Sequence, residues 1–135
     1  MHEQQEFHVI KPVTALTIPE LQQVCHVRAF NAGWWDEYLT MPTEYRKHFI
    51  AGKIAPIHSE VSEALEGFRK GKADDHLPHR PGVEVELADT IIRIMDLAGQ
   101  MQLDLAGAIA EKLTYNAQRH DHTREARASE GGESL

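Results

Sequence analysis

The chain has 135 residues, and its 14 basic and 21 acidic residues give a formal net charge of −7. This length is typical of one domain, and the negative charge argues against binding to the phosphate backbone of a nucleic acid polymer. A single cysteine, Cys25, excludes an intrachain disulfide and fits a reducing cytoplasm. No apolar run approaches the roughly 18 residues of a membrane span, and the polar N-terminus does not resemble a signal peptide. We therefore expect a soluble, cytoplasmic protein.

The first helix is predicted to begin at Thr17. Residues 1–15 before it are expected to be irregular or extended, because Pro12 disfavours a helix. Thr17-Ile18-Pro19-Glu20 has the spacing of a capping box, and the apolar pattern that follows continues to about Asn31. Cys25 lies in this apolar pattern and is expected to be a buried structural thiol.

Trp34 and Trp35 follow this helix in a predicted turn. Two adjacent indoles there either pack a corner of the core or form a stacking wall for a planar base. A short helical segment is predicted from Met41 to Phe49. A longer helix should follow, but Pro56 does not fit a regular helix interior. That helix either begins near Ala55, with Pro56 in its first turn, or is kinked at Pro56.

Two predicted helical segments between Ile57 and Asp96 each carry two acidic residues three positions apart. These are Glu60 with Glu63, and Glu86 with Asp89. Residues with this spacing share one face of a helix. Beside each pair runs an apolar stripe that is expected to face the core: Ile57, Val61, Ala64, Leu65 and Phe68 in the first segment, and Leu87, Ile91, Ile94, Met95 and Ala98 in the second.

If the two stripes pack together, the four carboxylates converge. Like charges about 5 Å apart repel by roughly 3 kcal/mol per pair at an effective dielectric constant near 20. Protons or cations would then be needed, and several oxygen ligands suit Mg²⁺, Mn²⁺ or Ca²⁺ better than zinc. The alternative is that the acids lie on solvated helix faces.

Residues 69–82 are predicted to connect the two acidic segments, because glycine and proline recur there. The basic side chains of this loop either contact a triphosphate or are solvated; they are Arg69, Lys70, Lys72, His76, His79 and Arg80. The helix after the loop is predicted from Gly82 to Met101. Within it, Arg93 is expected to pair with Asp89 or Asp96, its neighbours along the helix.

Asp104 is a good N-cap for a last helix. That helix carries a polar stripe at i, i+4 and i+7, formed by Lys112, Asn116 and Arg119. The stripe suits phosphate or sugar contacts, although a solvated face explains it as well. Residues 1–120 are predicted to form a single helical domain, and residues 121–135 a polar, flexible tail.

Glu60-x-x-Glu63, 22 intervening residues and Glu86-x-x-Asp89 together resemble the signature of MazG-like all-α nucleoside triphosphate pyrophosphohydrolases. The resemblance extends from about Lys53 to Arg119 and includes Glu111-Lys112, Asn116 and Arg119. Two positions depart from the family pattern. Pro56 stands where an aliphatic residue is usual, and Ser59 stands where many members have another glutamate.

The resemblance implies an all-α bundle of four or five helices, completed by association into a homodimer or homotetramer. It implies a Mg²⁺-dependent enzyme, with Mn²⁺ as a substitute, that cleaves a (d)NTP to a (d)NMP and pyrophosphate, in a role such as cleansing the nucleotide pool. Glu60, Glu63, Glu86 and Asp89 would hold the metal, and Glu63 would also orient or deprotonate the attacking water. The implied substrate contacts are Lys112, Asn116, Arg119, Trp34 and Trp35.

Another class of protein also fits the sequence. A non-catalytic helical module for protein interaction or regulation would carry acidic stripes and no nucleophile motif. Such a module would bind divalent cations weakly or not at all. A di-iron four-helix protein does not fit, because its metal site uses Glu-x-x-His on two helices.

Overall fold

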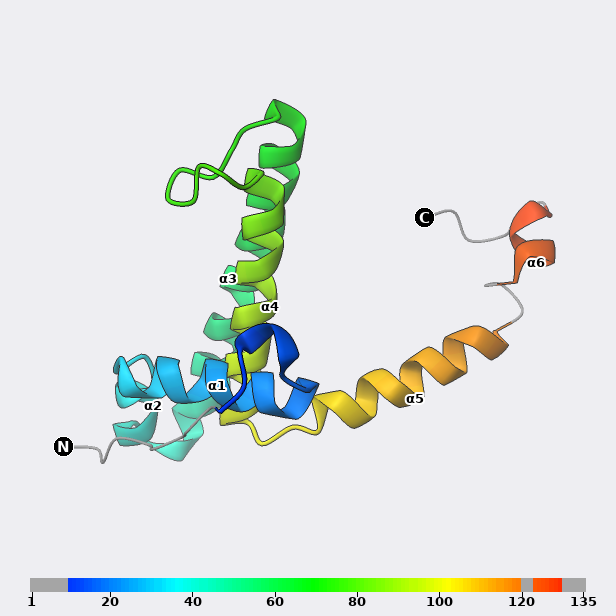
Figure 1. Cartoon of the computed structure of the whole chain (residues 1–135). Helices are drawn as coiled ribbons and strands as arrows, with labels where there is room; N and C mark the ends of the chain where they lie inside the picture. The colour runs from blue at the N-terminus through cyan, green and yellow to red at the C-terminus, as the bar shows by residue number, and fades with distance from the viewer. Residues whose placement is uncertain (1–9, 120–122, 130–135) are drawn as a thin grey trace. The chain divides into compact units, whose positions relative to one another are not determined.

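The structure, a computed structural model, describes residues 10–119 and 123–129 (Figure 1). These residues are helical without strands, which confirms the predicted all-α fold class. A 3₁₀ turn at Val13–Ala15 precedes six α-helices: α1 Ile18–Asn31, α2 Asp36–Thr40, α3 Thr43–Lys70, α4 Gly82–Gln100, α5 Leu105–Gln118 and α6 Arg124–Ala128. Among the described helices, none combines the length and the apolar character needed to cross a membrane.

The chain divides between Leu103 and Asp104 into two compact units. The first unit contains α1 to α4 and the second contains α5 and α6, and each is described by itself. The division falls before α5, whereas the sequence predicts one domain through residue 120.

Local sequence signals place the start of α1 as predicted. The Thr17 hydroxyl accepts a hydrogen bond from the Glu20 backbone at 3.4 Å, and the Glu20 carboxylate accepts one from the Thr17 backbone at 2.8 Å. This reciprocal capping box satisfies two backbone N–H groups that lack a partner within the helix. Lys11 Nζ, 2.9 Å from the Glu20 carboxylate, ties the preceding segment to the same cap.

One continuous helix, α3, replaces the two helical segments predicted around Pro56. It runs from Thr43 to Lys70 with Pro56 in its interior, so of the two alternatives the one in which a helix begins near Ala55 is wrong. Proline removes the hydrogen bond to the carbonyl four residues earlier, which here belongs to Gly52. Gly52 is exposed and has open space around it, so water can replace the missing donor.

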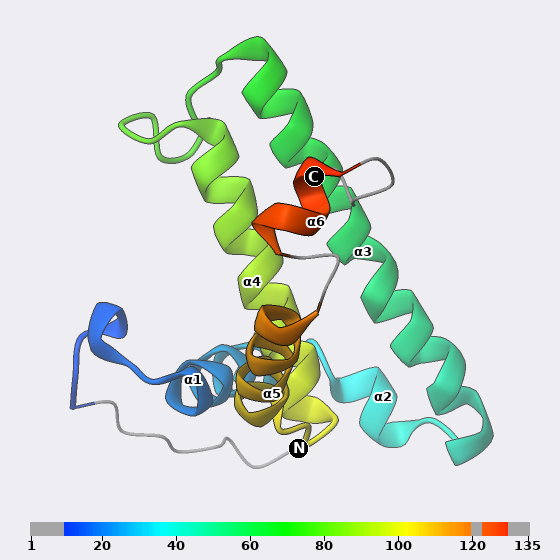
Figure 2. The ribbon, with the colours of Figure 1, turned by 90° about the vertical axis from the view of Figure 1, so that its right-hand side faces the viewer.

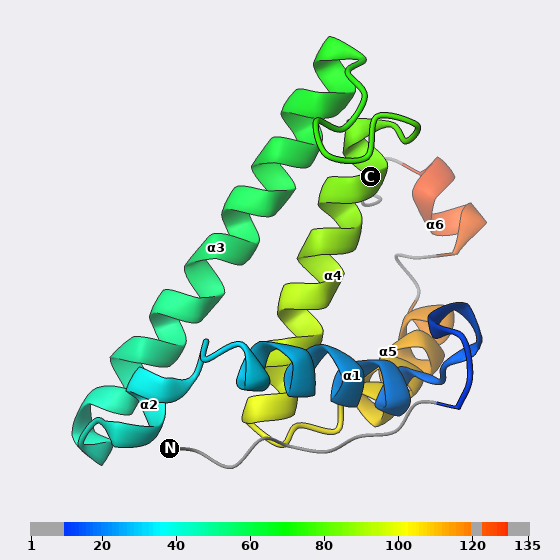
Figure 3. The ribbon, with the colours of Figure 1, turned by 60° about the vertical axis from the view of Figure 1, so that its left-hand side comes forward.

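Helices α3 and α4 lie side by side and run antiparallel (Figures 2 and 3). α3 ends at Gly71, whose positive φ of 60° favours glycine. The loop then returns to α4 through a bridge between Ala73 and Pro81. The helices approach closely at this end, where a Cβ added to Gly67 would lie 3.4 Å from the Val83 nitrogen. From there they diverge toward α1 and α2 (Figures 2 and 3).

The core of the first unit lies where α1 crosses α4. A Cβ added to Gly99 of α4 would lie only 2.5 Å from the Cβ of His26, so the two helices are in close contact. The apolar side chains buried at this crossing and beside it are Val24, Cys25, Trp35, Met95 and Ala98. The predicted burial of Cys25 is confirmed. Desolvation, followed by the charge of Asp96, raises the pKa of its thiol and disfavours the reactive thiolate.

The predicted apolar stripes do not all face the core of the single chain. Ala64, Met95 and Ala98 are buried, but Val61, Leu65 and Phe68 of α3 are exposed by 49%, 55% and 70%. Leu87 and Ile91 of α4 are each 49% exposed. The reason is that α3 meets α4 through Glu60, Ala64 and Gly67, a face that is rotated away from the aliphatic row.

The second unit begins with the predicted N-cap. Asp104 accepts a hydrogen bond from the Gly107 backbone at 2.9 Å, which confirms its capping role. Thr123 caps α6 in the same way, through the Ala126 backbone at 3.2 Å. α6 lies within the segment predicted to be a polar tail; residues 120–122 and 130–135 are outside the described part of the chain.

Candidate metal centre

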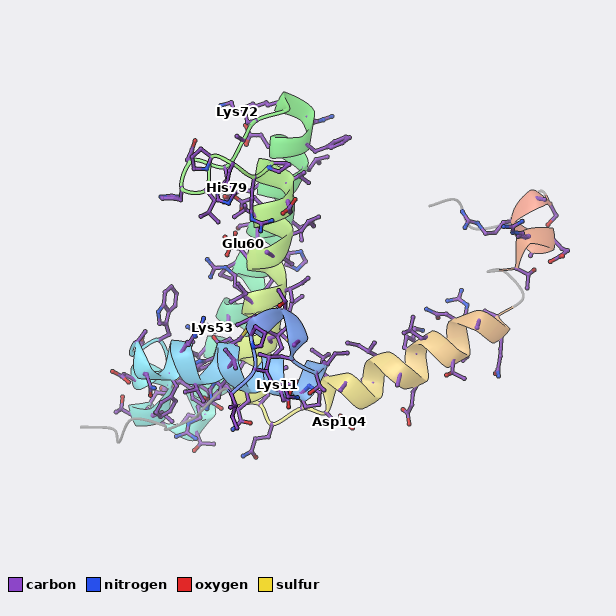
Figure 4. All side chains as sticks on the ribbon, in the orientation of Figure 1. Lys11, Lys53, Glu60, Lys72, His79 and Asp104 are labelled. Atoms are coloured by element: carbon purple, nitrogen blue, oxygen red, sulfur yellow. The ribbon has the colours of Figure 1, made fainter. Side chains whose placement is uncertain are left out.

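Three of the four predicted metal ligands come together between α3 and α4. Each of Glu60, Glu63 and Glu86 offers one carboxylate oxygen, and these oxygens all lie within 4.8 Å of one another. Glu60 is buried, Glu86 is half-buried and Glu63 is exposed. Figure 4 labels Glu60 on α3, together with Lys53 two turns earlier on the same helix. Asp89 is exposed and does not belong to this group of three.

The acids of the cluster repel one another. The pKa of Glu86 is raised, first by desolvation and then by the Glu60 carboxyl group and the charges of Glu63 and Asp89. The pKa of Asp89 is also raised, by desolvation and by the charge of Glu60, while Arg93 opposes the shift. A proton or a cation bound here would relieve this repulsion.

The donor set fits a hard divalent cation. Mg²⁺ binds oxygens at about 2.1 Å, so two ligands on opposite sides of the ion are about 4.2 Å apart. The three glutamate oxygens lie within 4.8 Å of one another, so small side-chain rotations would bring them to coordination distance. Ca²⁺, with longer bonds, fits the same spread. Carboxylates without thiolates or imidazoles favour Mg²⁺, Mn²⁺ or Ca²⁺ over zinc.

Arg93 pairs with a different acid from the two that the sequence predicts. Its Nε lies 2.6 Å from Oε1 of Glu60, across the interface between α4 and α3. Asp96 accepts hydrogen bonds from Trp35 Nε1 at 2.8 Å and from His26 Nδ1 at 3.1 Å instead. Helix spacing allows Arg93 to reach Asp89 or Asp96 on its own helix. Buried Glu60 is more desolvated than exposed Asp89, however, so a nearby positive charge stabilises it more.

Two cavities meet at Arg93. They also share Trp34 and Asp96 in their walls. The first, of about 450 Å³, is lined by α3 residues including Phe49 and Lys53. The second, of about 430 Å³, is lined mainly by α1 and α4, and its wall includes Asp89 from the acidic signature, with Arg28 from α1. Both volumes are within the range of small-molecule sites.

The two predicted base-contacting tryptophans have different environments. Trp35 is fully buried and packs edge-on against His26 and Tyr38, so it is a core residue without a free ring face. Trp34 is 57% exposed and lines both cavities. Lys53 donates to its carbonyl at 3.0 Å, and the Lys53 ammonium lies 5.4 Å from the centre of its ring. The predicted stacking role can therefore belong to Trp34 and not to Trp35.

The sequence did not indicate that Lys53 would line the first cavity, and the partner predicted for Arg93 is wrong. Lys53 precedes Glu60 by seven residues, and Arg93 follows Glu86 by seven. Two helical turns return a side chain to nearly the same face, so each cation shares a helix face with an acid of its own helix. What the spacing did not indicate was that Arg93 of α4 would pair with Glu60 of α3.

The predicted substrate contacts on α5 belong to the second unit. Lys112 Nζ lies 4.7 Å from the centre of the Tyr115 ring, and the Arg119 guanidinium lies 6.0 Å from the same ring. The Asn116 side-chain carbonyl is buried without a hydrogen-bond partner among the described residues. Because this unit is described by itself, the contribution of these residues to the site stays a prediction.

Two of the basic loop residues have acidic partners one helical turn away. Lys70 pairs with Glu66 and Arg80 pairs with Glu84, both on exposed surfaces. Lys72 and His79 lie at the loop end of the α3–α4 pair (Figure 4). A contact between this loop and a triphosphate stays a prediction.

The raised pKa values give a signed prediction for stability. A carboxyl group whose folded-state pKa exceeds its unfolded value adds stability at low pH, and this contribution is lost as the pH rises through the folded pKa. In metal-free buffer at pH 7, Glu86→Gln should therefore raise the melting temperature, by about 2–5 °C. The gain should shrink as the pH falls toward the ordinary carboxyl value of 4.5.

Glu84→Gln is the matched control, because Glu84 lies two residues earlier and pairs with Arg80 on an exposed surface. It should leave the melting temperature nearly unchanged or lower it slightly. Thermal unfolding followed by circular dichroism across pH measures both variants. If Glu86→Gln melts at a lower temperature than wild type at pH 7, the claim that repulsion within the cluster destabilises the metal-free protein is wrong.

Comparisons with protein-family models, with curated proteins and with solved structures find no match to this chain.

Proposed function

We propose that this protein is a Mg²⁺-dependent nucleoside triphosphate pyrophosphohydrolase, which cleaves a (d)NTP to a (d)NMP and pyrophosphate. The observation that carries the proposal is the convergence of Glu60, Glu63 and Glu86 from two helices. These are three of the four acids of the MazG-like signature. Two cavities whose walls include Arg93, the partner of Glu60, provide space for a small organic ligand.

The proposed roles of the acids follow from their burial. Glu60, Glu63 and Glu86 hold the metal through one carboxylate oxygen each, with Asp89 as a further ligand. Exposed Glu63 reaches water and is suited to orient it and to accept its proton as the phosphoric anhydride is broken and pyrophosphate leaves. Bound Mg²⁺ would supply electrostatic stabilisation of the charge that develops on the phosphate oxygens.

The cavity walls provide the proposed nucleotide contacts. Trp34 offers an exposed indole for stacking with a base. Lys53 and Arg28 add positive charge in the walls of the first and second cavities, respectively. Phosphate and sugar contacts by Lys112, Asn116 and Arg119 of α5 stay a prediction from the resemblance. Pro56 lines the first cavity within an unbroken α3, so this departure from the family pattern leaves the acids in place.

The alternative, a non-catalytic interaction module, is favoured by one observation. The aliphatic rows of α3 and α4 are exposed, as a docking surface would be. The two readings differ in metal binding, because a docking module has no need of a divalent cation. We place the protein in the cytoplasm on the basis of its single, buried cysteine.

Turnover tests the proposed activity. With Mg²⁺ and a panel of canonical and modified (d)NTPs, we expect release of pyrophosphate and a nucleoside monophosphate from at least one nucleotide. Glu63→Gln should lower kcat by about 10² or more, since it removes the group that accepts the proton. Glu66→Gln is the matched control: Glu66 lies three residues further along α3, is exposed and pairs with Lys70.

One outcome would contradict the enzyme assignment, and another would contradict the proposed role of Glu63. One is the absence of pyrophosphate release from every nucleotide, combined with no binding of Mg²⁺ or Mn²⁺ by calorimetry. The other is equal loss of turnover in Glu63→Gln and Glu66→Gln, which would indicate that Glu63 has no special role.

We also propose that the exposed aliphatic rows are covered by a second copy of this chain. Val61, Leu65 and Phe68 recur along one side of α3 and would cost stability if left in water. Light scattering should give a molar mass at least twice that of one chain. Leu65→Lys should shift the mass toward one chain, whereas Ser62→Lys, on another face of α3, should not. A wild-type mass of one chain at micromolar concentration would contradict this proposal.

A further inference from the structure

Among the described pairs in which a lysine or arginine meets an acid, the Arg93–Glu60 pair has the most buried acid. The Glu60 side chain is 11% exposed, whereas the acids paired with Lys11, Lys70 and Arg80 are 35%, 61% and 51% exposed. A buried carboxylate needs a close positive charge, and Arg93 supplies it at 2.6 Å. Arg93 itself is 39% exposed, so its side chain has solvent beside it and room to move.

The position of Arg93 gives it two sets of partners. On one side it bonds the acidic cluster through Glu60. On the other side it lines both cavities, where it is accompanied by Trp34. A guanidinium group binds a carboxylate or a phosphate equally well in geometric terms, because its N–H donors form a planar fork.

A divalent cation and Arg93 would compete for Glu60. A cation held by Glu60, Glu63 and Glu86 needs an oxygen from each, and one Glu60 oxygen is bonded to Arg93. Two positive charges sharing one carboxylate repel each other over a few ångströms in a poorly solvated site. The cation has three carboxylates to hold it, whereas the described ion pair of Arg93 with the cluster involves Glu60 alone.

We propose that Arg93 is an exchangeable counter-cation of the acidic cluster: it pairs with Glu60 when the cluster holds no metal, and a bound divalent cation displaces it into the adjoining cavities, where it binds substrate phosphate. This inference rests on the proposed metal site. In the metal-free protein Arg93 neutralises and positions Glu60, and in the metal-bound protein it binds substrate. The Arg93–Glu60 pair would thus stabilise the metal-free protein and lower the affinity of the acidic cluster for metal.

Metal affinity tests the competition directly, without requiring turnover. Calorimetric titration of the full chain with Mn²⁺ or Mg²⁺ should give about tenfold tighter binding for Arg93→Gln than for wild type. Arg93→Lys, which keeps the charge, should bind metal with an affinity close to that of wild type. Arg28→Gln is the control for net charge, because Arg28 lines the second cavity and makes no described bond to the acidic cluster; it should change the affinity less than twofold.

The displacement itself can be observed by NMR. The Nε–Hε signal of Arg93, assigned by its absence in Arg93→Lys, should shift on addition of Mg²⁺ with the midpoint that calorimetry gives. In metal-free buffer, Arg93→Gln should melt at a lower temperature than wild type, and saturating Mg²⁺ should restore more of its stability than it adds to wild type. Each variant is first checked for a native helical circular dichroism spectrum.

The results of these experiments distinguish failure of this inference from failure of the proposed function. Wild-type metal binding that Arg93→Gln leaves unchanged or weakens would overturn the exchange while leaving the metal site intact. An Arg93 signal that does not respond to saturating Mg²⁺ would overturn it as well. If neither wild type nor any variant binds metal, both the proposed metal site and the exchange fail.

Discussion

Mutual repulsion among Glu60, Glu63 and Glu86 is the constraint on which the rest of the first unit depends. Their oxygens lie within 4.8 Å of one another, and desolvation and neighbouring charges raise the pKa of Glu86. Packing of α1 against α4, and the close approach of α3 and α4 at Gly67, hold the acids together against this repulsion. Arg93 offsets part of the cost by pairing with Glu60, the most buried of the three.

The orientation of α3 that places these acids beside α4 also explains the exposed aliphatic rows. A helix turns by about 100° per residue, so a face that carries Glu60, Ala64 and Gly67 toward α4 directs Val61 and Leu65 elsewhere. The face of α3 that meets α4 therefore carries carboxylates and small residues. The aliphatic side chains of α3 stay exposed on the single chain, where another molecule can cover them. In this account the candidate site and the proposed self-association are two consequences of one rotation of α3.

Local sequence signals predicted the ends of several helices. Features that depend on contacts between helices could not be predicted from them. The capping box at Thr17, the N-cap at Asp104 and the helix from Gly82 involve neighbours within one turn, so their chemistry is visible in the sequence. α3 continues through Pro56, four residues after exposed Gly52, and the partner of Arg93 lies on another helix. The i, i+3 spacing predicted both acidic pairs, but it could not say that α3 would bring Glu60 and Glu63 to Glu86 while Asp89 stayed outside the group. Nor could it distinguish Trp35, fully buried, from exposed Trp34.

The most direct test of the central claim is a crystal structure of the protein grown with Mn²⁺, with anomalous diffraction used to locate the ion. We expect an anomalous peak between α3 and α4, about 2.1–2.3 Å from carboxylate oxygens of Glu60, Glu63 and Glu86. Arg93 should then be turned away from Glu60. A Mn²⁺ ion bound elsewhere, or none at these glutamates at saturating concentration, would contradict the claim that the cluster is a metal centre.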